Sequence, residues 1–495
     1  MIRLRGLLGL TLLVSGVSLC GEALEAHWPQ FRGVNSSGVA IDSDPPMRFE
    51  EDDNLKWKRS IDPGHSSPCI AGDYLFLTSF DREAETLSVH CLDRNSGVDV
   101  WRRDLRVKEF EKGHPSFNPA SSSPATDGEV VVVYFGSYGL ICYTVTGEKL
   151  WEKRLPVTKS FAGNATSPAI YGDKVVLYRA NVVDHYLVAY DRLTGREEWK
   201  RPQSEPFAIE LSCTACPILY QDQLLVHSAR SIQSYRLLDG QLNWITKCDT
   251  TATTTPVLAE GEVIVAAWNK MGEAELRPPI PDYGTLLKEN DADGNGLIGR
   301  DEFPKLWVFH RPLGAEAPLN GMSVRFQSTD RNRDNQIDEG EWEGALKYVE
   351  SMRAGYETHG LLGIDLESRG VLHDDQVRLL LERGIPEVPS PVYIDGYVYL
   401  IKNGGLLTCV DVARGRRVYL ERTQGKGTHY ASPIIAGNRL YCFSGQGQIS
   451  VLSLGEDPEL LGVSDLAEPI YATPAVVART MYIRSHDHLF AFERK

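Results

Sequence analysis

The sequence predicts an all-β protein, an eight-bladed β-propeller, with a small helical segment inserted in one blade. The main observation is a short pattern that recurs eight times along the 495 residues. Each repeat opens with a Ser-Pro or Thr-Pro turn, or Cys-Pro in the fourth repeat, and continues into an apolar strand. The prolines of these turns are Pro68, Pro124, Pro168, Pro217, Pro256, Pro391, Pro433 and Pro474. Repeats of about 45 residues with about four short strands each are typical of propeller blades.

The second half of each repeat contains a strand that is apolar on both faces. When the repeats are aligned, one column of this strand holds small residues, namely Cys91, Cys142, Ala189, Ser234, Gly363, Cys409, Val451 and Ala491. The residues two positions earlier are all aliphatic, and the residues one position later are also apolar. A strand of this kind is sandwiched between neighbouring sheets, as the inner strands of packed blades are.

A glycine turn and a tryptophan follow this strand in several repeats. The pairs are Gly97 and Trp101, Gly147 and Trp151, Gly195 and Trp199, and Gly240 and Trp244. Later repeats keep the turn glycines Gly370 and Gly415, and we place Asp374 and Tyr419 at the position of the tryptophan. We interpret these tryptophans as residues that pack between blades. Trp28 and Trp268 lie outside the repeat, and we expect them to contribute less to stability.

The two ends of the chain are predicted to meet in one blade. The last repeat stops at Lys495 without a tryptophan strand of its own, and residues 55–59 near the N-terminus, which include Trp57, have the pattern of the missing strand. Pairing of the termini would close the ring and leave no open sheet edges.

Two twelve-residue stretches, 291–302 and 330–341, interrupt the fifth repeat, and both match the EF-hand loop. Oxygen-bearing side chains stand at positions 1, 3 and 5, a backbone carbonyl is available at position 7, and a glutamate at position 12 supplies two oxygens. The predicted ligands are Asp291, Asp293, Asn295, Leu297 and Glu302 in the first loop and Asp330, Asn332, Asp334, Gln336 and Glu341 in the second. We therefore expect two calcium ions.

One departure from the loop pattern concerns Asn335. It occupies position 6 of the second loop, where the backbone needs a positive φ and glycine is usual. The second site is therefore expected to be the weaker one. The predicted boundaries are 28–270 and 358–495 for the propeller and 272–356 for the EF-hand pair.

The N-terminus has the features of an export signal. A basic start at Arg3 and Arg5 is followed by an apolar run and by a small-x-small cleavage site, so residues 1–23 are predicted to be a signal peptide. Cys20 is a possible site for a lipid anchor, and no other stretch is long and apolar enough to span a membrane. The net charge of −15 argues against a nucleic-acid partner.

The turn at residues 191–199, Asp-Arg-Leu-Thr-Gly-Arg-Glu-Glu-Trp, resembles the tryptophan-docking repeat of the PQQ-repeat propellers, the quinoprotein alcohol dehydrogenase-like family. The stretch 28–33, Trp-Pro-Gln-Phe-Arg-Gly, is similar to the opening of many members. Enzymes of this family hold pyrroloquinoline quinone over calcium and carry a vicinal Cys-Cys pair, which this sequence lacks. Non-enzymatic members include the propeller lipoprotein of the outer-membrane β-barrel assembly machine, which presents loops to protein partners.

The remaining candidate residues do not indicate an active site. Cys213 and Cys216 have metal or redox spacing, but they overlie the turn of the fourth repeat; a disulfide from this pair to Cys248 or to another cysteine is the alternative. The turn histidines that could face one end of the ring are His65, His114, His429, His486 and His488. We assign no catalytic or cofactor-binding residue.

The sequence as a whole favours a non-enzymatic protein. We predict an exported, periplasmic or secreted, calcium-binding propeller that acts as a scaffold for an unknown protein partner. The alternative is a PQQ-dependent oxidoreductase with the quinone in the propeller funnel.

Overall fold

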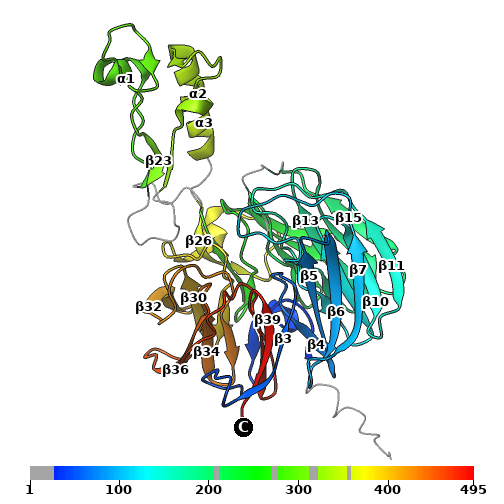
Figure 1. Ribbon diagram of the computed structural model, residues 1–495. Helices are drawn as coiled ribbons and strands as arrows, with labels where there is room; N and C mark the ends of the chain where they lie inside the picture. Colours follow the sequence, from blue (N-terminus) through cyan, green and yellow to red (C-terminus); the bar gives the residue numbers. More distant parts are fainter. Residues whose placement is uncertain are drawn as a thin grey trace, which may run out of the picture.

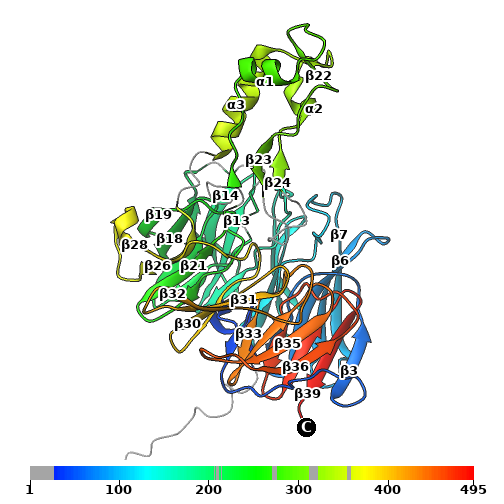
Figure 2. The same ribbon diagram turned by 90° about the vertical axis from the view of Figure 1, so that its left-hand side faces the viewer.

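The computed structural model describes residues 27–205, 207, 211–212, 214–269, 276–310, 321–353 and 358–495. Within these residues, eight sheets, each with four antiparallel strands and some with a fifth strand added, form the blades of a propeller, so the predicted eight-bladed fold is confirmed (Figures 1 and 2). The protein is mostly β, with a few short helices. The predicted signal peptide, Cys20 and Cys213 lie outside the described residues, as do the positions at which the insert boundaries were predicted.

Each of the first four blades is a meander whose strands follow one another from the axis outward. These strands are β4 (Cys69–Ala71), β5 (Tyr74–Asp81), β6 (Thr86–Asp93) and β7 (Asp99–Arg106); β8 (Ala125–Thr126), β9 (Val130–Phe135), β10 (Gly139–Thr144) and β11 (Lys149–Arg154); β12 (Ala169–Tyr171), β13 (Lys174–Ala180), β14 (His185–Asp191) and β15 (Glu197–Pro202); β16 (Ile218–Tyr220), β17 (Gln223–His227), β18 (Ser231–Arg236) and β19 (Leu242–Lys247).

The last four blades have the same order, except that the outer strand of the eighth comes from the N-terminal part of the chain. Their strands are β20 (Val257–Leu258), β21 (Glu262–Ala267), β26 (Gly360–Asp365) and β28 (Val377–Leu381); β29 (Val392–Ile394), β30 (Tyr397–Lys402), β31 (Leu406–Asp411) and β32 (Arg416–Arg422); β33 (Ile434–Ala436), β34 (Arg439–Phe443), β35 (Gln448–Ser453) and β36 (Leu460–Asp465); β37 (Ala475–Val477), β38 (Thr480–Arg484), β39 (His488–Glu493) and β3 (Leu55–Ser60).

The ring closes as the sequence predicts. Strand β3 pairs antiparallel with β39, with Trp57 opposite Ala491, and the two strands lie side by side in Figure 1. In the same way Trp101 lies opposite Cys91 and Trp199 opposite Ala189 in their own blades. The first tryptophan of the repeat therefore completes the last blade.

A chain of hydrogen bonds joins the inner ends of the blades and explains the Ser/Thr-Pro turns. The residue before the proline donates its backbone N–H to the side-chain hydroxyl of the matching residue in the next blade. The pairs are Ser67 to Ser123, Ser123 to Ser167, Cys216 to Thr255, Thr255 to Ser390, Ser390 to Ser432, and Ser432 to Thr473, at 2.9–3.0 Å. All these groups are buried, so the hydroxyls satisfy N–H groups that would otherwise lack a partner.

Four tryptophans dock on the next blade through one hydrogen bond each. The indole Nε1–H donates to a turn carbonyl at 2.8–2.9 Å, in the pairs Trp57 to Arg94, Trp101 to Val145, Trp151 to Arg192 and Trp199 to Leu237. The turn glycines lie against the indole rings. At Gly97 and Gly195, for example, a Cβ would come 2.7 Å from a ring atom of Trp57 and Trp151. The positive φ of these glycines and this close approach together require glycine.

The fifth and sixth blades differ in the residue that occupies the tryptophan position. Arg378 lies opposite Gly363, so the prediction that Asp374 takes this place is wrong. The connection before β28 contains a short strand, β27 (Gly370–Val371), which pairs with β19, and a 3₁₀ helix (Asp374–Gln376). Because of these two elements, the outer strand begins later in the sequence than the repeat pattern predicts. In the sixth blade Tyr419 lies opposite Cys409, as predicted.

The N-terminal segment crosses the propeller at the end opposite to the insert. Strand β1 (His27–Trp28) pairs with the inner strand of the first blade, and β2 (Val39–Ala40) runs parallel to the inner strand of the seventh. Between them, beside a 3₁₀ turn (Val34–Ser36), Gln30 donates to the Tyr171 hydroxyl and Asn35 accepts from the Leu219 N–H. The segment thus contacts the inner strands of blades on several sides of the axis.

After crossing the axis, the N-terminal segment runs outward between the seventh and eighth blades. Gly462 occupies the tryptophan position of the seventh blade, and a side chain there would collide with the backbone carbonyl of Met47. Phe49 fills the space instead, with edge-on contacts to Tyr441 and Phe492. The seventh repeat therefore lacks a tryptophan because another part of the chain takes its place.

The helical insert leaves the fifth blade between β21 and β26 and stands away from the propeller (Figures 1 and 2). Its elements are α1 (Tyr283–Asn290), β22 (Ile298–Gly299), β23 (Trp307–His310), β24 (Gly321–Ser323), α2 (Phe326–Thr329), β25 (Gln336–Ile337) and α3 (Glu339–Arg353). Strands β23 and β24 pair with each other and form the part of the insert nearest the propeller.

Candidate metal centre

The two predicted loops lie back to back. Strands β22 and β25 pair antiparallel, with Ile298 opposite Ile337. Both isoleucines are fully buried in an apolar cluster with Leu286, Phe326 and Trp342. This cluster fixes the loops relative to each other, which a pair of EF-hand loops requires.

A residue that the sequence analysis did not single out ties the two loops together. The hydroxyl of Tyr283, the first residue of α1, lies 3.1 Å from the carbonyl of Gly296 and 2.9 Å from that of Ile337. One belongs to the first loop and the other to the second. No sequence motif marks this tyrosine, because its role depends on the pairing of the loops.

The first loop brings three of its predicted ligands together. One oxygen each from Asp291, Asp293 and Glu302 lie within 4.8 Å of one another. The Glu302 carboxylate also accepts backbone N–H groups from Gly299 and Ala292, both at 2.8 Å, and these hydrogen bonds hold its pKa below the usual range. An ionised carboxylate is the form that binds a cation.

The other two predicted ligands of the first loop lie close to this group. The Asn295 side chain donates to Asp293 Oδ2 at 3.0 Å and accepts from the Leu297 N–H at 2.8 Å. Leu297 directly precedes β22, and it is the peptide carbonyl of this residue, at position 7, that is predicted to bind the metal.

The second loop holds its first and last ligands in a buried position. Asp330 and Glu341 are only 5% and 9% exposed. Glu341 Oε1 accepts the N–H groups of Arg331 and Asn332 at 2.8 and 3.1 Å, so the last carboxylate of the loop is attached to its beginning. The ring that a calcium ion would occupy is thereby closed.

The remaining ligands of the second loop are tied to each other along the chain. Asn332 donates to Asp334 Oδ2 at 2.9 Å and accepts from the Asp334 N–H at 2.8 Å. Asp334 Oδ1 accepts from the N–H of Gln336, the predicted position 7 ligand, at 2.8 Å. Asn335 has a φ of 65°, the left-handed conformation that position 6 requires.

The chain after the two loops differs. The second loop leads directly into the fifteen-residue helix α3. No helix follows Glu302; residues 303–306 have no regular secondary structure and lead to β23. Pro304 accounts for this, because proline disfavours the helical conformation at the residue before it. The first loop is therefore flanked by a helix on one side only.

Arg353, at the end of α3, fastens the insert at its base. Its guanidinium donates to the carbonyls of Val308 at 2.7 Å, Pro278 at 2.9 Å and Trp307 at 3.2 Å. These belong to β23 and to the beginning of the insert. A basic residue in the last turn of a helix is too common for the sequence to reveal this role.

The other candidate residues form no comparable site. Burial lowers the pKa of His65 to about 3 and that of His429 to about 4, while His488 bonds to Glu468 at 2.7 Å. Within the described ranges, the only group of three or more metal-ligating side chains is the one in the first loop. Among the described cysteines, Cys216 and Cys248 are free and buried, so they do not form the disulfide considered above.

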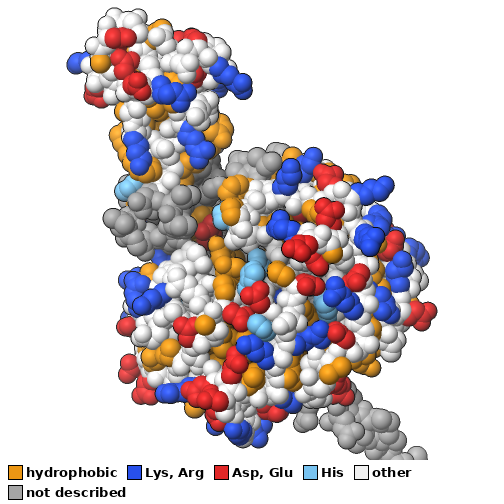
Figure 3. Space-filling model, viewed as in Figure 1, with side chains coloured by type: hydrophobic (Ala, Val, Ile, Leu, Met, Phe, Trp, Pro, Cys, Tyr) orange, Lys and Arg blue, Asp and Glu red, His pale blue; other side chains and the backbone are white. Residues whose placement is uncertain are grey.

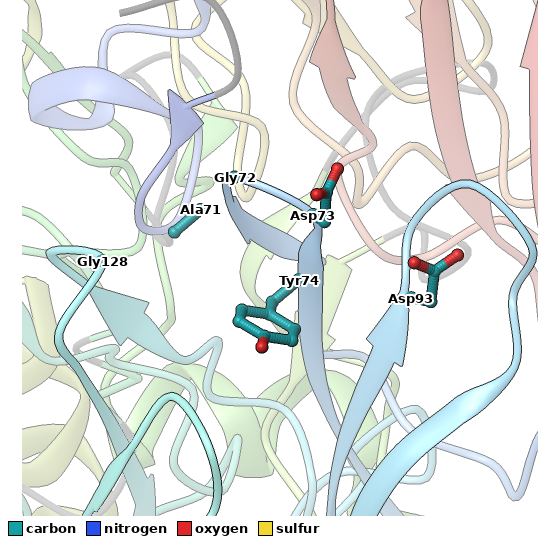
Figure 4. A pocket seen from close by; sticks show the side chains of 6 residues that line it. All are labelled: Ala71, Gly72, Asp73, Tyr74, Asp93 and Gly128. Carbon is teal, nitrogen blue, oxygen red and sulfur yellow. The ribbon is translucent and has the colours of Figure 1, made fainter. Parts of the chain in front are cut away.

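An open pocket lies between turns of the first two blades (Figure 4). Its lining residues are Ala71, Gly72, Asp73, Tyr74, Asp93 and Gly128. Asp93 is occupied by its own turn, where it accepts hydrogen bonds from the Ser96 hydroxyl at 2.7 Å and N–H at 2.8 Å; these hydrogen bonds lower its pKa. We therefore interpret the pocket as part of the repeat structure.

The surface shown in Figure 3 carries acidic and basic side chains interspersed over the propeller and the insert. Among the helices that the structure describes, none is long and apolar enough to cross a membrane.

The comparisons with known proteins agree with the propeller. A family model described as "Outer membrane protein assembly factor BamB" matches residues 85–278. The crystal structure of BamB from Moraxella catarrhalis superposes with a TM-score of 0.52 at 12% identity, covering 89% of this chain and 97% of that chain. No curated protein matches the sequence significantly.

Two dehydrogenases share the same architecture. A europium-containing methanol dehydrogenase superposes with a TM-score of 0.53 at 11% identity, covering 95% of this chain and 98% of that chain. Quinohemoprotein alcohol dehydrogenase from Comamonas testosteroni gives 0.52 at 11%, covering 94% and 80%. At these identities the likeness concerns the fold alone, an eight-bladed propeller similar to that of BamB.

Proposed function

We propose that the insert binds two calcium ions, one in each loop, as an EF-hand pair. The observation that carries this proposal is the closure of both loops by their last glutamate, whose Oε1 accepts two N–H groups from the start of its own loop in each case. The side-chain ligands offer only oxygen, and a hard cation such as calcium prefers six to eight oxygen ligands. The paired arrangement of β22 and β25 supports both sites together.

Calorimetric titration of the full chain with calcium chloride tests this proposal. We expect a stoichiometry of two, with affinities of about 10⁻⁴ to 10⁻³ M, the range of extracellular calcium modules. Glu302→Gln and Glu341→Gln should each remove one site, because each substitution takes away a bidentate carboxylate. Asp301→Asn and Glu343→Gln are matched controls at exposed neighbours and should retain both sites. Absence of calcium-dependent heat in the wild type would refute the proposal.

We further propose that the propeller is an exported scaffold that binds a protein partner. Support comes from the family model named for an outer-membrane assembly factor and from the shared architecture. The test is a pull-down from envelope extract with the full chain as bait, with and without a calcium chelator. A specific partner that is retained by the wild type and lost after deletion of the insert would connect both parts of the proposal.

The alternative function is a PQQ-dependent oxidoreductase. Its support is the fold that this chain shares with the two dehydrogenases. The sequence lacks the adjacent cysteines of that family. Adding the quinone and calcium to purified protein and recording the absorption spectrum distinguishes the two functions. A bound-quinone spectrum would favour the enzyme.

A further inference from the structure

We infer that the second loop is the tighter calcium site and fills first. This inference rests on the proposed calcium binding and reverses the order that Asn335 suggests from the sequence. Two differences between the loops carry it: the hydrogen bonding of the first aspartate and the support of the last glutamate.

The first aspartates of the two loops differ in their hydrogen bonds. In the first loop, the Asp291 carboxylate accepts N–H groups from Gly294 and Asn295 on one oxygen and from Gly296 on the other, at 2.8–3.2 Å. In the second loop, Asp330 Oδ2 accepts only the N–H of Asn335, at 3.1 Å. Its Oδ1 is buried and has no hydrogen-bond partner among the described residues.

A buried carboxylate oxygen without a partner is costly, because burial removes its water and nothing replaces it. The partly exposed Asp291 keeps both its water contacts and its N–H partners. A calcium ion in the second loop would supply the missing partner of Asp330 and neutralise the buried charge. Calcium binding in the second loop therefore relieves a larger desolvation cost of the metal-free protein than binding in the first loop does.

The last glutamates also differ in support. Asp338 precedes helix α3 and accepts the Glu341 N–H at 2.8 Å, while Glu341 Oε2 accepts the Asp338 N–H at 3.3 Å. This reciprocal pair is a capping box, and the helix N-terminus favours the negative charge of Glu341. The residue equivalent to Asp338 in the first loop is Gly299, which has no side chain to reciprocate, and no helix follows. The second loop is therefore better preorganised.

The asparagine at position 6 of the second loop does not offset these advantages. Asn335 already has the required φ of 65°, and its N–H bonds to Asp330. The cost of this conformation is paid when the loop folds, so it affects the stability of the insert more than the affinity of the folded loop.

The test is calorimetric titration of the full chain with calcium chloride, using matched variants in both loops. Asp330→Asn and Asp291→Asn change the same position without changing side-chain size, and Glu341→Gln and Glu302→Gln change position 12. In the wild type we expect two dissociation constants that differ by about tenfold, toward the two ends of the range of about 10⁻⁴ to 10⁻³ M. Glu302→Gln and Asp291→Asn should leave the smaller constant within about threefold of its wild-type value.

Glu341→Gln and Asp330→Asn should abolish the tighter phase and leave only the weaker one. Circular dichroism checks that each variant is folded. If Glu341→Gln unfolds the insert, Glu302→Gln and Asp291→Asn still test the inference, because both must keep the tighter phase. Loss of the tight phase in Glu302→Gln, or two indistinguishable constants in the wild type, would overturn the inference and leave the proposed calcium binding intact. Absence of calcium heat in the wild type would overturn both.

Discussion

The blades that dock through tryptophan and the blades that do not show which part of the repeat matters. In four blades an indole N–H donates to the carbonyl three residues after the small residue of the next blade; Trp57 and Trp199 are examples, with Arg94 and Leu237 as acceptors. In the fifth blade Arg378 donates to the equivalent carbonyl, that of Val412, at 2.6 Å. The side chain has changed, but the donor and acceptor positions have not.

Trp244 shows the converse. It keeps the tryptophan and is fully buried, yet its Nε1–H has no hydrogen-bond partner among the described residues. The carbonyl that corresponds to its acceptor, Leu366, receives a hydrogen bond from Gln223 at 3.1 Å. Blade docking therefore consists of two separable parts, apolar packing and a single hydrogen bond to a turn, and each can be supplied by a different residue.

The largest effect is expected from removal of the closing strand. Deleting residues 54–60 removes β3, leaves β39 without its outer neighbour and opens the ring. We expect loss of cooperative thermal unfolding, measured by circular dichroism. Lys56→Ala, a change on the exposed side of the same strand, is the control and should unfold like the wild type. An unchanged Tm of the deletion variant would show that this strand does not close the ring.

The two parts of docking can be separated by substitution of the tryptophans. Trp199→Ala should lower the free energy of unfolding by roughly 3–5 kcal/mol, the usual loss for a buried tryptophan. Trp199→Phe loses packing and the hydrogen bond, whereas Trp244→Phe loses packing only, so we expect Trp199→Phe to cost about 1 kcal/mol more. Guanidinium unfolding measures both. Equal losses in the two Phe variants would mean that the hydrogen bond adds nothing.

Arg378 provides a smaller test in the irregular half of the ring. Arg378→Met retains the length of the side chain but removes the donor to Val412, and it leaves the paired Glu262 without its cation. We expect a loss of about 1–2 kcal/mol. Asp374→Ala, at the position suggested by the sequence, should stay within about 0.5 kcal/mol of the wild type. A larger loss of stability for Asp374→Ala than for Arg378→Met in chemical unfolding would instead support the prediction that Asp374 takes the tryptophan position.

The smallest effect is expected from removal of the insert. Ala267 and Gly360 are directly paired at the point where the insert leaves and returns, so a short Asn-Gly turn can join β21 to β26. Replacing residues 269–358 by such a turn should leave the β-type circular dichroism and shift Tm by only a few degrees, because long surface insertions cost little closure entropy. Loss of the folded signal would show that the insert stabilises the propeller.

Much of the propeller follows from local patterns. The eight repeats, the small-residue column and the turn glycines each depend on residues within one repeat, so the sequence predicts them. The closure by Trp57 is long-range, but it follows from the same repeat pattern, because the last repeat lacks the strand that residues 55–59 supply. The position of Arg378 does not follow, because β27 leaves its own blade and pairs with β19. Gly462 is explained only by the passage of Met47, more than four hundred residues earlier in the chain.

The ranking of tryptophans shows the same limit. Trp28 and Trp268 lie outside the repeat, and the sequence gives no reason to expect them in the core. In the structure they are 2% and 5% exposed, more buried than Trp57 at 9%, and Gly33 packs against the Trp28 ring. Because both tryptophans are this buried, we no longer expect their substitution to lower the free energy of unfolding less than substitution of the repeat tryptophans. In the insert, the predicted ligand positions rest on spacing, but the contrast between Asp291 and Asp330 needs coordinates.

The pairing of β3 with β39 also determines the order in which the molecule can form. Apart from the fifth blade, which contains the insert, the strands of the first seven blades are joined by short connections and can pair soon after they are made, whereas the eighth blade requires residues 55–60 and 488–493. The N-terminal segment must therefore wait for nearly the whole chain before it finds its partners. Contacts of such long sequence separation form slowly, and the unpaired strands stay exposed to aggregation in the meantime. We expect closure of the eighth blade to be the last step of folding and the step that most needs a chaperone.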